Sequence, residues 1–374
     1  KQLKNYKNPI FFLTLILFFN ILLCSNRYPV FLIHGFMGWG KNELNNYYYW
    51  GGKFDLEEYL IKNGFEVYTL SVGPVSSNWD RAIEAFYQIK GGQVDYGYNH
   101  SNEYGLIQKP ETKYYYGIYP EWSEDKPIHI IGHSQGGQTA RMLEYLLKNN
   151  FNNESSELLS KNYNQWIKSI TTISTPHNGT TLAPIINNYF PYMQSFVIWL
   201  DIISPNSLYN FDLEQWGIYK NKNENLIDYV RKLKKSPISK TKNFSSYDLS
   251  IEGAEIFNNI YETDSSTYYF TFSTTNNNNP KLMYKIQSDL MSNSKDFGEE
   301  WRENDGLVNT ISMFGPSNGI IENYSNVPIK GKWQHIKKIN LDHNEIIGHK
   351  INRKDLEKIK DMYMKHLKLL STLK

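Results

Sequence analysis

The sequence predicts an α/β fold in which a mostly parallel sheet is covered by helices on both faces. Strand-like apolar runs alternate along its 374 residues with segments of helical periodicity, which is typical of that arrangement. Strands buried on both faces are expected to be uniformly apolar, and IHII at 128–131 fits this with one histidine inside it. We find no internal repeat and no linker, so we expect a single domain over residues 26–374.

The individual elements follow from these runs in chain order. The expected strands are VFLI at 30–33, FEVYTL at 65–70, IHII at 128–131, IKSITTI at 167–173 and YYFTF at 268–272. The expected helices are DRAIEAFYQI at 80–89, GGQTARMLEYLL at 136–147, NLIDYVRKLK at 225–234 and KDLEKIKDMYMKHLKLL at 354–370. An alternating run at 331–340, GKWQHIKKIN, is a further strand-like segment.

The N-terminal segment has the layout of a secretory signal. Lysines at positions 1, 4 and 7 precede an uncharged apolar run at 10–23, and a more polar stretch follows. We therefore expect residues 1–25 to be a signal peptide and the protein to be secreted. An uncleaved membrane anchor is the alternative, although the run is shorter than the roughly 20 apolar residues of a spanning helix. Glycosylation sequons lie at Asn99, Asn153, Asn178, Asn243 and Asn323.

The charge balance argues against a nucleic-acid-binding protein, and the cysteine content excludes an internally disulfide-bonded one. The 40 Lys and Arg residues are balanced by 38 Asp and Glu residues, so the formal net charge is only +2. A surface that follows nucleic-acid phosphates needs a much larger basic excess, so we expect no nucleic-acid partner. Cys24 is the single cysteine, which excludes a disulfide within the chain.

A Gly-x-Ser-x-Gly motif marks the candidate nucleophile. Ser134 lies in the segment GHSQG at 132–136, directly after the expected strand 128–131 and directly before an expected helix. A strained strand-to-helix turn with small residues on both sides exposes the serine hydroxyl. The N-terminus of the following helix also favours negative charge beside that hydroxyl. The motif in this context predicts a nucleophilic serine.

Such a serine requires an oxyanion hole. This architecture takes one amide from the residue after the nucleophile and a second from a loop near the N-terminus. The first is Gln135. The second is Phe36, because the expected strand 30–33 runs directly into His-Gly-Phe.

The general base and its acidic partner are expected after the serine, with the acid first. Of the nine histidines, His343 lies where a loop would follow the last strand and precede the C-terminal helix. His34, His133 and His177 lie beside other motifs but precede every carboxylate that fits this order. Asp305 is the candidate acid. The order of residues alone leaves three alternatives, which are Asp289, Asp296 and Asp342.

Six segments together resemble one family, the secreted triacylglycerol lipases of thermophilic bacilli and staphylococci. They are FLIHGFMGWG at 31–40, SSNWDRA at 76–82, HSQGGQTARM at 133–142, TPHNGTT at 175–181, ENDG at 303–306 and DH at 342–343. The similarity extends from about Tyr28 to the C-terminus. The resemblance implies an α/β-hydrolase fold and a triad of Ser134, Asp305 and His343, and it selects Asp305 among the candidate acids.

The same resemblance implies a zinc site held by two aspartates and two histidines, which this chain matches incompletely. Asp80 and His100 occupy two of the positions, while Glu214 and Leu106 replace the other two ligands. Leucine has no lone pair to offer, so water or Glu103 would have to complete a tetrahedral site. The alternative is that Asp80 is a helix N-cap and His100 a surface residue. A structural zinc ion is therefore an open expectation.

No other cofactor is expected. Glu345 matches one calcium ligand of the family, but Lys350 stands where a second carboxylate would be. Calcium needs several oxygen ligands and is repelled by an ammonium group, so we expect no calcium site. The proposed chemistry itself requires no cofactor.

An apolar stretch at about 183–210 corresponds to the lid of the resembling lipases, and a core helix is the alternative. The expected function is a secreted lipase that hydrolyses esters of long-chain acylglycerols at a lipid–water interface. A phospholipase or a short-chain carboxylesterase would use the same triad. A secreted lipase-like binding protein without turnover is the alternative from another class, and the sequence does not predict an oligomeric state.

Overall fold

The computed structural model describes residues 26–182, 209–221, 224–235, 241–276, 282–293 and 297–374. Its centre is a seven-stranded sheet with the order β2-β1-β5-β6-β7-β9-β8. Every pair of neighbouring strands in this sheet is parallel. A separate antiparallel pair is formed by β3 (Gly92–Gln93) and β4 (Tyr114–Tyr115). The strands of the large sheet are β1 (Val30–Ile33), β2 (Val67–Leu70), β5 (Ile128–His133), β6 (Ile167–Ile173), β7 (Tyr268–Thr274), β8 (Ile321–Asn323) and β9 (Trp333–Ile339).

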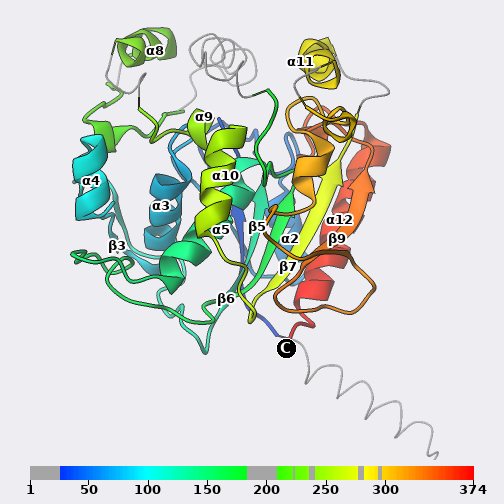
Figure 1. Cartoon of the computed structure of the whole chain (residues 1–374), viewed down its shortest axis with the longest axis horizontal. Coiled ribbons are helices and arrows are strands. Elements are labelled where there is room, and N and C mark those ends of the chain that lie inside the picture. The colour runs from blue at the N-terminus through cyan, green and yellow to red at the C-terminus, as the bar shows by residue number, and fades with distance from the viewer. Residues whose placement is uncertain (1–25, 183–208, 222–223, 236–240, 277–281, 294–296) are drawn as a thin grey trace, which may run out of the picture.

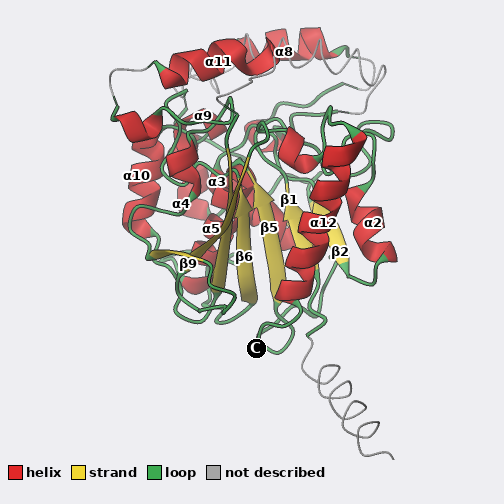
Figure 2. Cartoon of the chain, turned by 90° about the vertical axis from the view of Figure 1, so that its right-hand side faces the viewer, coloured by secondary structure: helices red, strands yellow, loops and turns green. Residues whose placement is uncertain are grey.

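Helices cover both faces of this sheet. Figure 2 shows α2 and α12 on one face and α3 and α5 on the other, while α8 and α11 lie at one end of the molecule. The fold is therefore the three-layered α/β architecture that the sequence predicts. The helices are α2 (Leu56–Lys62), α3 (Asn78–Lys90), α4 (Tyr98–Tyr104), α5 (Gln135–Lys148), α8 (Leu226–Lys234), α9 (Ser245–Asp248), α10 (Ile251–Ile260), α11 (Leu282–Ser292) and α12 (Arg353–Leu370).

Alternate residues of each central strand enter two separate cores. In β1, Val30 and Leu32 pack into the core that contains α2 and α12 residues, and Phe31 and Ile33 pack into the core under α3 and α5. Each such side chain contributes about 1.5–3 kcal/mol when it is fully buried. Burial on both faces explains why the strand sequences are apolar at successive positions rather than alternating.

The expected strands at 30–33 and 167–173 have the predicted bounds. The expected strand at 65–70 begins two residues late, because the amide of Phe65 donates to the carbonyl of Leu60 and closes the end of α2. Helix α3 begins before its expected start, since Ser77 is its N-cap and accepts from the amide of Asp80. The alternative interpretation of Asp80 as an N-cap is therefore wrong.

The two ends of the described chain are hydrogen-bonded to each other. The amide of Asn26 donates to the carbonyl of Ser371 at 2.7 Å. The side-chain amide of Asn26 donates to the carbonyls of Leu370 and Leu373 at 2.8 and 3.0 Å. The part of the chain from residue 26 onward thus starts and ends at the same corner of the molecule (Figure 1).

Some predicted features fall outside the described residues. These are the signal peptide at 1–25 with Cys24, and the lid at 183–210 apart from its last two residues. Within the described part of the chain, no helix has the length and apolar character that crossing a membrane requires. The sequon at Asn243 is 4% exposed, so its side chain is inaccessible in the folded protein, whereas Asn99, Asn153 and Asn323 are exposed.

A buried carboxyl group lies on the face of α5 that packs against the sheet. Glu144 accepts hydrogen bonds from the hydroxyls of Tyr261 and Tyr269, at 2.5 and 2.8 Å. Burial raises the pKa of Glu144 from 4.5 to about 7, against the opposing effect of these two hydroxyls. The folded protein therefore binds this proton more tightly than the unfolded chain does.

Stability should accordingly depend on pH through Glu144. The stabilisation from the bound proton is complete below about pH 4.5 and is lost as the pH rises through about 7. Relative to Glu144→Gln, we expect the free energy of unfolding of the parent protein to fall by on the order of 3 kcal/mol over that interval. Urea unfolding of both proteins from pH 4.5 to 8 measures this. A difference between them that is constant with pH would contradict the prediction.

Candidate active site

Ser134 occupies the sharp turn between β5 and α5. Its backbone has φ +57° and ψ −129°, a conformation that costs a non-glycine residue about 1–3 kcal/mol. The turn is also crowded: a Cβ added at Gly136 would lie 2.1 Å from the carbonyl oxygen of Ile33. A Cβ added at Gly132 would lie 2.4 Å from the backbone of Gly136. The glycines of the motif are thus required by close packing, and Ser134 itself is 7% exposed.

Asp305 and His343 form a buried pair at the ends of neighbouring strands. Nδ1 of His343 donates to Oδ2 of Asp305 at 2.8 Å, and the amide of His343 donates to the carbonyl of Asp305 at 3.1 Å. Thr274 donates its hydroxyl to the same Oδ2 at 2.6 Å, and the amides of Leu307 and Val308 donate to Oδ1. The carboxylate places the proton on Nδ1, which leaves Nε2 able to accept one.

The structure also places the alternative acids. Oδ1 of Asp342 accepts from the amides of Asn344 and Glu345, so that side chain forms the turn that carries His343. Asp289 is exposed on α11, and Asp296 lies outside the described residues. Asp305 is the candidate acid that contacts the imidazole of His343.

His133, the residue directly before Ser134, contacts His343. The imidazole rings of His133 and His343 lie 4.7 Å apart, and Nε2 of His133 donates to the carbonyl of His343 at 2.9 Å. Within the described residues, no hydrogen bond joins the hydroxyl of Ser134 to His343. Catalytic hydrogen bonds are often long or unformed without substrate, so a missing hydrogen bond does not argue against Ser134 and His343 as a catalytic pair.

The candidate oxyanion amides come from the residue after Ser134 and from the loop whose Gly35 packs against Ser134. Gln135 is the first residue of α5, where helix amides have no partner within the helix. Its side chain is held by the carbonyl of Ser76 at 3.2 Å and the hydroxyl of Ser245 at 2.9 Å. Phe36 follows Gly35, whose carbonyl accepts from Nδ1 of His34 at 2.9 Å.

A buried arginine fixes the loop that carries Phe36. Arg81 of α3 donates to the carbonyl of His34, to the carbonyl of Gly73 at 2.9 Å, and to the hydroxyl of Thr139 on α5 at 2.9 Å. Burial lowers the pKa of Arg81 to about 10, which still leaves it charged at neutral pH. The loop and the helix after Ser134 are thus joined by one side chain.

Sequence reasoning missed several of these supporting residues. His34 and His133 were considered only as general bases and were excluded because they precede the candidate acids in the chain. In the structure, His34 holds the Gly35 carbonyl and His133 holds the His343 carbonyl. Their positions within the His-Gly and Gly-x-Ser-x-Gly motifs could have indicated a structural role at the site. Arg81 lay in the segment that resembles the family, but no spacing rule pointed to its contact with His34.

Two of the predicted metal ligands, Asp80 and His100, contact each other, whereas Glu214 contacts other residues. Nε2 of His100 lies 2.8 Å from Oδ1 of Asp80, and its ring stacks on Trp79 at 5.0 Å. The side-chain amides of Gln215 and Asn243 donate to Oδ2 of Asp80 at 3.3 and 3.1 Å. Amide N–H groups therefore surround the carboxylate where a metal would require lone pairs.

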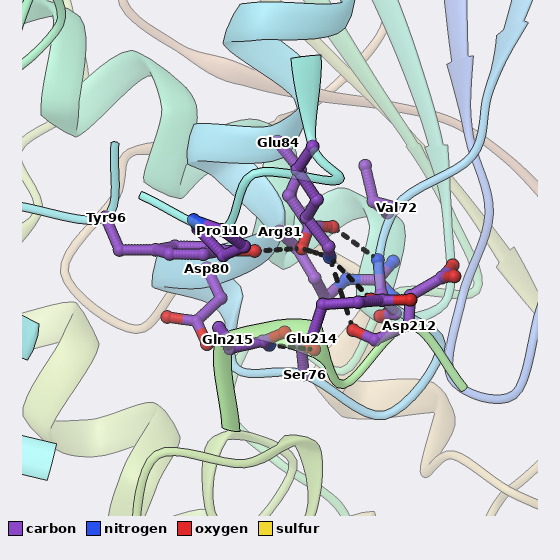
Figure 3. A network of polar contacts seen from close by, with 12 residues as sticks. Val72, Ser76, Asp80, Arg81, Glu84, Tyr96, Pro110, Asp212, Glu214 and Gln215 are labelled. Atoms are coloured by element: carbon purple, nitrogen blue, oxygen red, sulfur yellow. Dashed lines mark hydrogen bonds and ion pairs between the residues drawn. The ribbon is translucent and has the colours of Figure 1, made fainter. Parts of the chain in front are cut away.

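Glu214 faces a different partner. Its carboxylate lies 3.7 Å from the ammonium of Lys113 and accepts from the side chain of Asn210 at 3.0 Å. Figure 3 shows Gln215, rather than Glu214, beside Asp80. Among the described residues, no group of three or more His, Cys, Asp or Glu side chains is arranged to hold a metal ion. The side chains at Asp80 do not fit a zinc ion, so we assign no role to a metal.

Comparison with known sequences identifies related proteins over nearly the whole described chain. The sequence model of the lipase-like, C-terminal domain family matches residues 26–371. Lipase 2 of Staphylococcus aureus is 36% identical over 352 residues, which cover 86% of this chain and 50% of that protein. The chain thus spans about half the length of the curated relatives it matches.

Solved structures of similar sequence share the fold. Lipase 1 from Pelosinus fermentans matches with a TM-score of 0.84 and 36% identity, covering 93% of this chain and 100% of that one. EstA from Clostridium botulinum matches with a TM-score of 0.83 and 37% identity, covering 93% and 88%. Staphylococcus hyicus lipase matches with a TM-score of 0.78 and 31% identity, covering 92% and 96%. The fold is therefore of the α/β-hydrolase type.

The contacts of Asp80 predict that the fold does not depend on zinc. EDTA and added zinc should each leave the thermal midpoint of the parent protein unchanged. Asn243→Asp should lower the midpoint by several degrees, because it places a second carboxylate against Asp80, and zinc should restore part of the loss. Differential scanning calorimetry with and without each addition measures this. A midpoint that falls when EDTA is added to the parent would show that a metal is bound.

Proposed function

Because the chain belongs to the lipase-like, C-terminal domain family, we propose that it is a secreted lipase that hydrolyses esters of long-chain acylglycerols at a lipid–water interface. The observation that carries the proposal is the buried hydrogen bond between His343 and Asp305, formed at the same edge of the sheet as the strained Ser134. Secretion is proposed from the signal-like layout of residues 1–25.

The proposed reaction proceeds through an acyl-enzyme. The hydroxyl oxygen of Ser134 attacks the ester carbonyl carbon while Nε2 of His343 takes the hydroxyl proton. The amides of Phe36 and Gln135 bind the oxyanion that forms. The tetrahedral intermediate expels the alcohol, which receives the proton from His343. Water then attacks the acyl-enzyme by the same steps and releases the carboxylic acid.

Asp305 supports both steps from behind the imidazole. It keeps the proton on Nδ1 and stabilises the imidazolium that forms when Nε2 is protonated. General base catalysis of this kind contributes about 10²- to 10⁴-fold to the rate, and each oxyanion donor about 10²- to 10³-fold.

The backbone of Ser134 argues against a binding protein without turnover. Its positive φ costs about 1–3 kcal/mol, and a glycine at this position would avoid that cost. A serine at a position that glycine would occupy without strain is what a nucleophile at this turn requires, and this supports turnover. A phospholipase or a short-chain carboxylesterase would use the same residues. The preferred headgroup distinguishes a phospholipase from a triacylglycerol lipase, and the preferred acyl-chain length distinguishes a carboxylesterase from it.

Variants of the triad should each abolish most of the turnover. We expect Ser134→Ala and His343→Ala to lower kcat by about four to six powers of ten, and Asp305→Asn by about four, without additivity in combination. Asp342→Asn is the matched control, because asparagine can form the same turn, and it should stay within about threefold of the parent. Steady-state hydrolysis of a p-nitrophenyl ester measures all four. Parent-like turnover by Ser134→Ala would exclude this serine as the nucleophile.

Substrate preference should follow the proposed lipid class. On emulsified substrates we expect kcat/KM for long-chain triacylglycerol to exceed that for short-chain esters and for phosphatidylcholine by at least about tenfold. Titration of released fatty acid at constant pH measures each rate, with Ser134→Ala as the blank. A preference for phosphatidylcholine or for tributyrin would replace the proposal with the phospholipase or the carboxylesterase, respectively.

A further inference from the structure

The hydroxyl of Tyr49 touches the candidate active site at two points, although the reaction above does not use it. It accepts a hydrogen bond from the amide of Gly35 at 2.7 Å. It also lies 2.7 Å from Nδ1 of His133, the residue directly before the nucleophile. Tyr49 is 6% exposed, so solvent does not compete effectively for either contact.

The direction of each hydrogen bond follows from the chemistry of the groups at its ends. Nε2 of His133 lies 2.9 Å from the carbonyl oxygen of His343, which can only accept, so Nε2 carries the proton. Burial, together with the neighbouring His343, lowers the pKa of His133 well below its ordinary value, so the ring is neutral and Nδ1 is an acceptor. Tyr49 therefore donates to Nδ1. The result is one continuous series of donors and acceptors from the Gly35 amide to the His343 carbonyl.

The first end of this series and the side chain of His34 together set the direction of the Phe36 amide. The hydroxyl of Tyr49 fixes the N–H of the peptide group that joins His34 to Gly35. Nδ1 of His34 fixes the carbonyl of the next peptide group, which contains the N–H of Phe36. A trans peptide is planar with its C=O and N–H pointing in opposite directions, so holding the carbonyl sets the direction of the amide.

Tyr49 is itself held rigidly. Nε2 of His349 donates to its backbone carbonyl at 2.8 Å. Its ring packs edge-on against Trp39 and Trp50, with centroids 5.3 and 5.6 Å away. The hydroxyl is therefore a fixed reference point rather than a mobile group that adapts to its neighbours.

We propose that Tyr49 is a positioning residue that acts through Gly35 and His133 to hold the Phe36 amide and the backbone of His343 at a fixed separation across Ser134. This inference rests on the proposed ester hydrolysis. The amide and the imidazole serve the same tetrahedral intermediate, so their relative placement must be set before substrate binds. Neither Gly35 nor His343 fixes the other directly, and the Tyr49 hydroxyl is the link between them.

The test compares Tyr49→Phe with Tyr363→Phe. The Tyr363 hydroxyl is also buried in the same core and has no hydrogen-bond partner among the described residues, so its removal is the matched control. On a soluble p-nitrophenyl ester we expect Tyr49→Phe to lower kcat about 10- to 100-fold, with KM within about twofold of the parent. We expect Tyr363→Phe to leave both constants within about twofold.

Two further measurements separate positioning from a general loss of structure. A fluorophosphonate titration counts the reactive serines, so that kcat refers to folded molecules. Inhibition by a trifluoromethyl ketone, which forms a tetrahedral oxyanion on the serine, should weaken by the same factor as kcat in Tyr49→Phe. A merely destabilised protein would bind this inhibitor normally in its folded fraction.

A second variant tests the link itself. His133→Gln interrupts the same series, so it should lower kcat comparably, and the double variant with Tyr49→Phe should lose little more than either single variant. Full additivity of the two losses would overturn the proposal, as would parent-like kcat and parent-like trifluoromethyl ketone affinity in Tyr49→Phe. If the parent protein neither hydrolyses esters nor reacts with the fluorophosphonate, the proposed function itself fails.

Discussion

The contact between the first turn of α5 and the end of β1 constrains the whole candidate active site. The backbones approach so closely at Gly136 that an added methyl group would lie 2.1 Å from the carbonyl oxygen of Ile33. This approach brings the start of the helix, the strained Ser134 and the loop that carries Phe36 next to one another in space. Because neighbouring strands are parallel, the loops after β7 and β9 reach the same edge of the sheet and bring Asp305 and His343 to it.

Buried polar groups make this edge rigid. The Asp305 carboxylate accepts from His343, from Thr274 and from two backbone amides, and the Arg81 guanidinium donates to three oxygens. A buried polar group that loses its partner costs about 1–3 kcal/mol, and a charged group costs more. Displacing any one element would therefore leave several groups unsatisfied at once. This cost holds the Phe36 loop, the Ser134 turn and the His343 loop in one arrangement.

The sequence predicts the features that depend on local pattern. The strands at 30–33 and 167–173 have the predicted bounds: VFLI is continuously apolar because it is buried on both faces, and IKSITTI is rich in the β-branched residues that favour strands. The turn at Ser134 is predicted correctly because it requires glycines at fixed spacing. Order along the chain alone did not select Asp305, since a turn-forming aspartate such as Asp342 has the same local pattern.

The remaining features depend on contacts between distant segments. Tyr49 meets a histidine 84 positions away, and no local rule connects the two. At Glu214 and Gln215, neighbouring side chains in a short 3₁₀ turn point about 120° apart, so which of them faces Asp80 is decided by the entry of the chain into that turn. Asp212, with φ +51°, sets that entry. A backbone conformation of this kind in a non-glycine residue has no reliable sequence signature.

The hydrogen bonds that join Asn26 to the end of α12 and the residues after it make the chain from residue 26 to residue 374 almost a closed ring. The edge of the sheet that carries Ser134 does not depend on which peptide bond is left open. Joining residue 374 to residue 26 through a short glycine-rich linker and opening the chain at an exposed loop would give a circular permutant with the same core contacts. The same corner is a natural attachment point for a surface anchor or a fused reporter domain, since it lies at the opposite ends of the strands from Ser134.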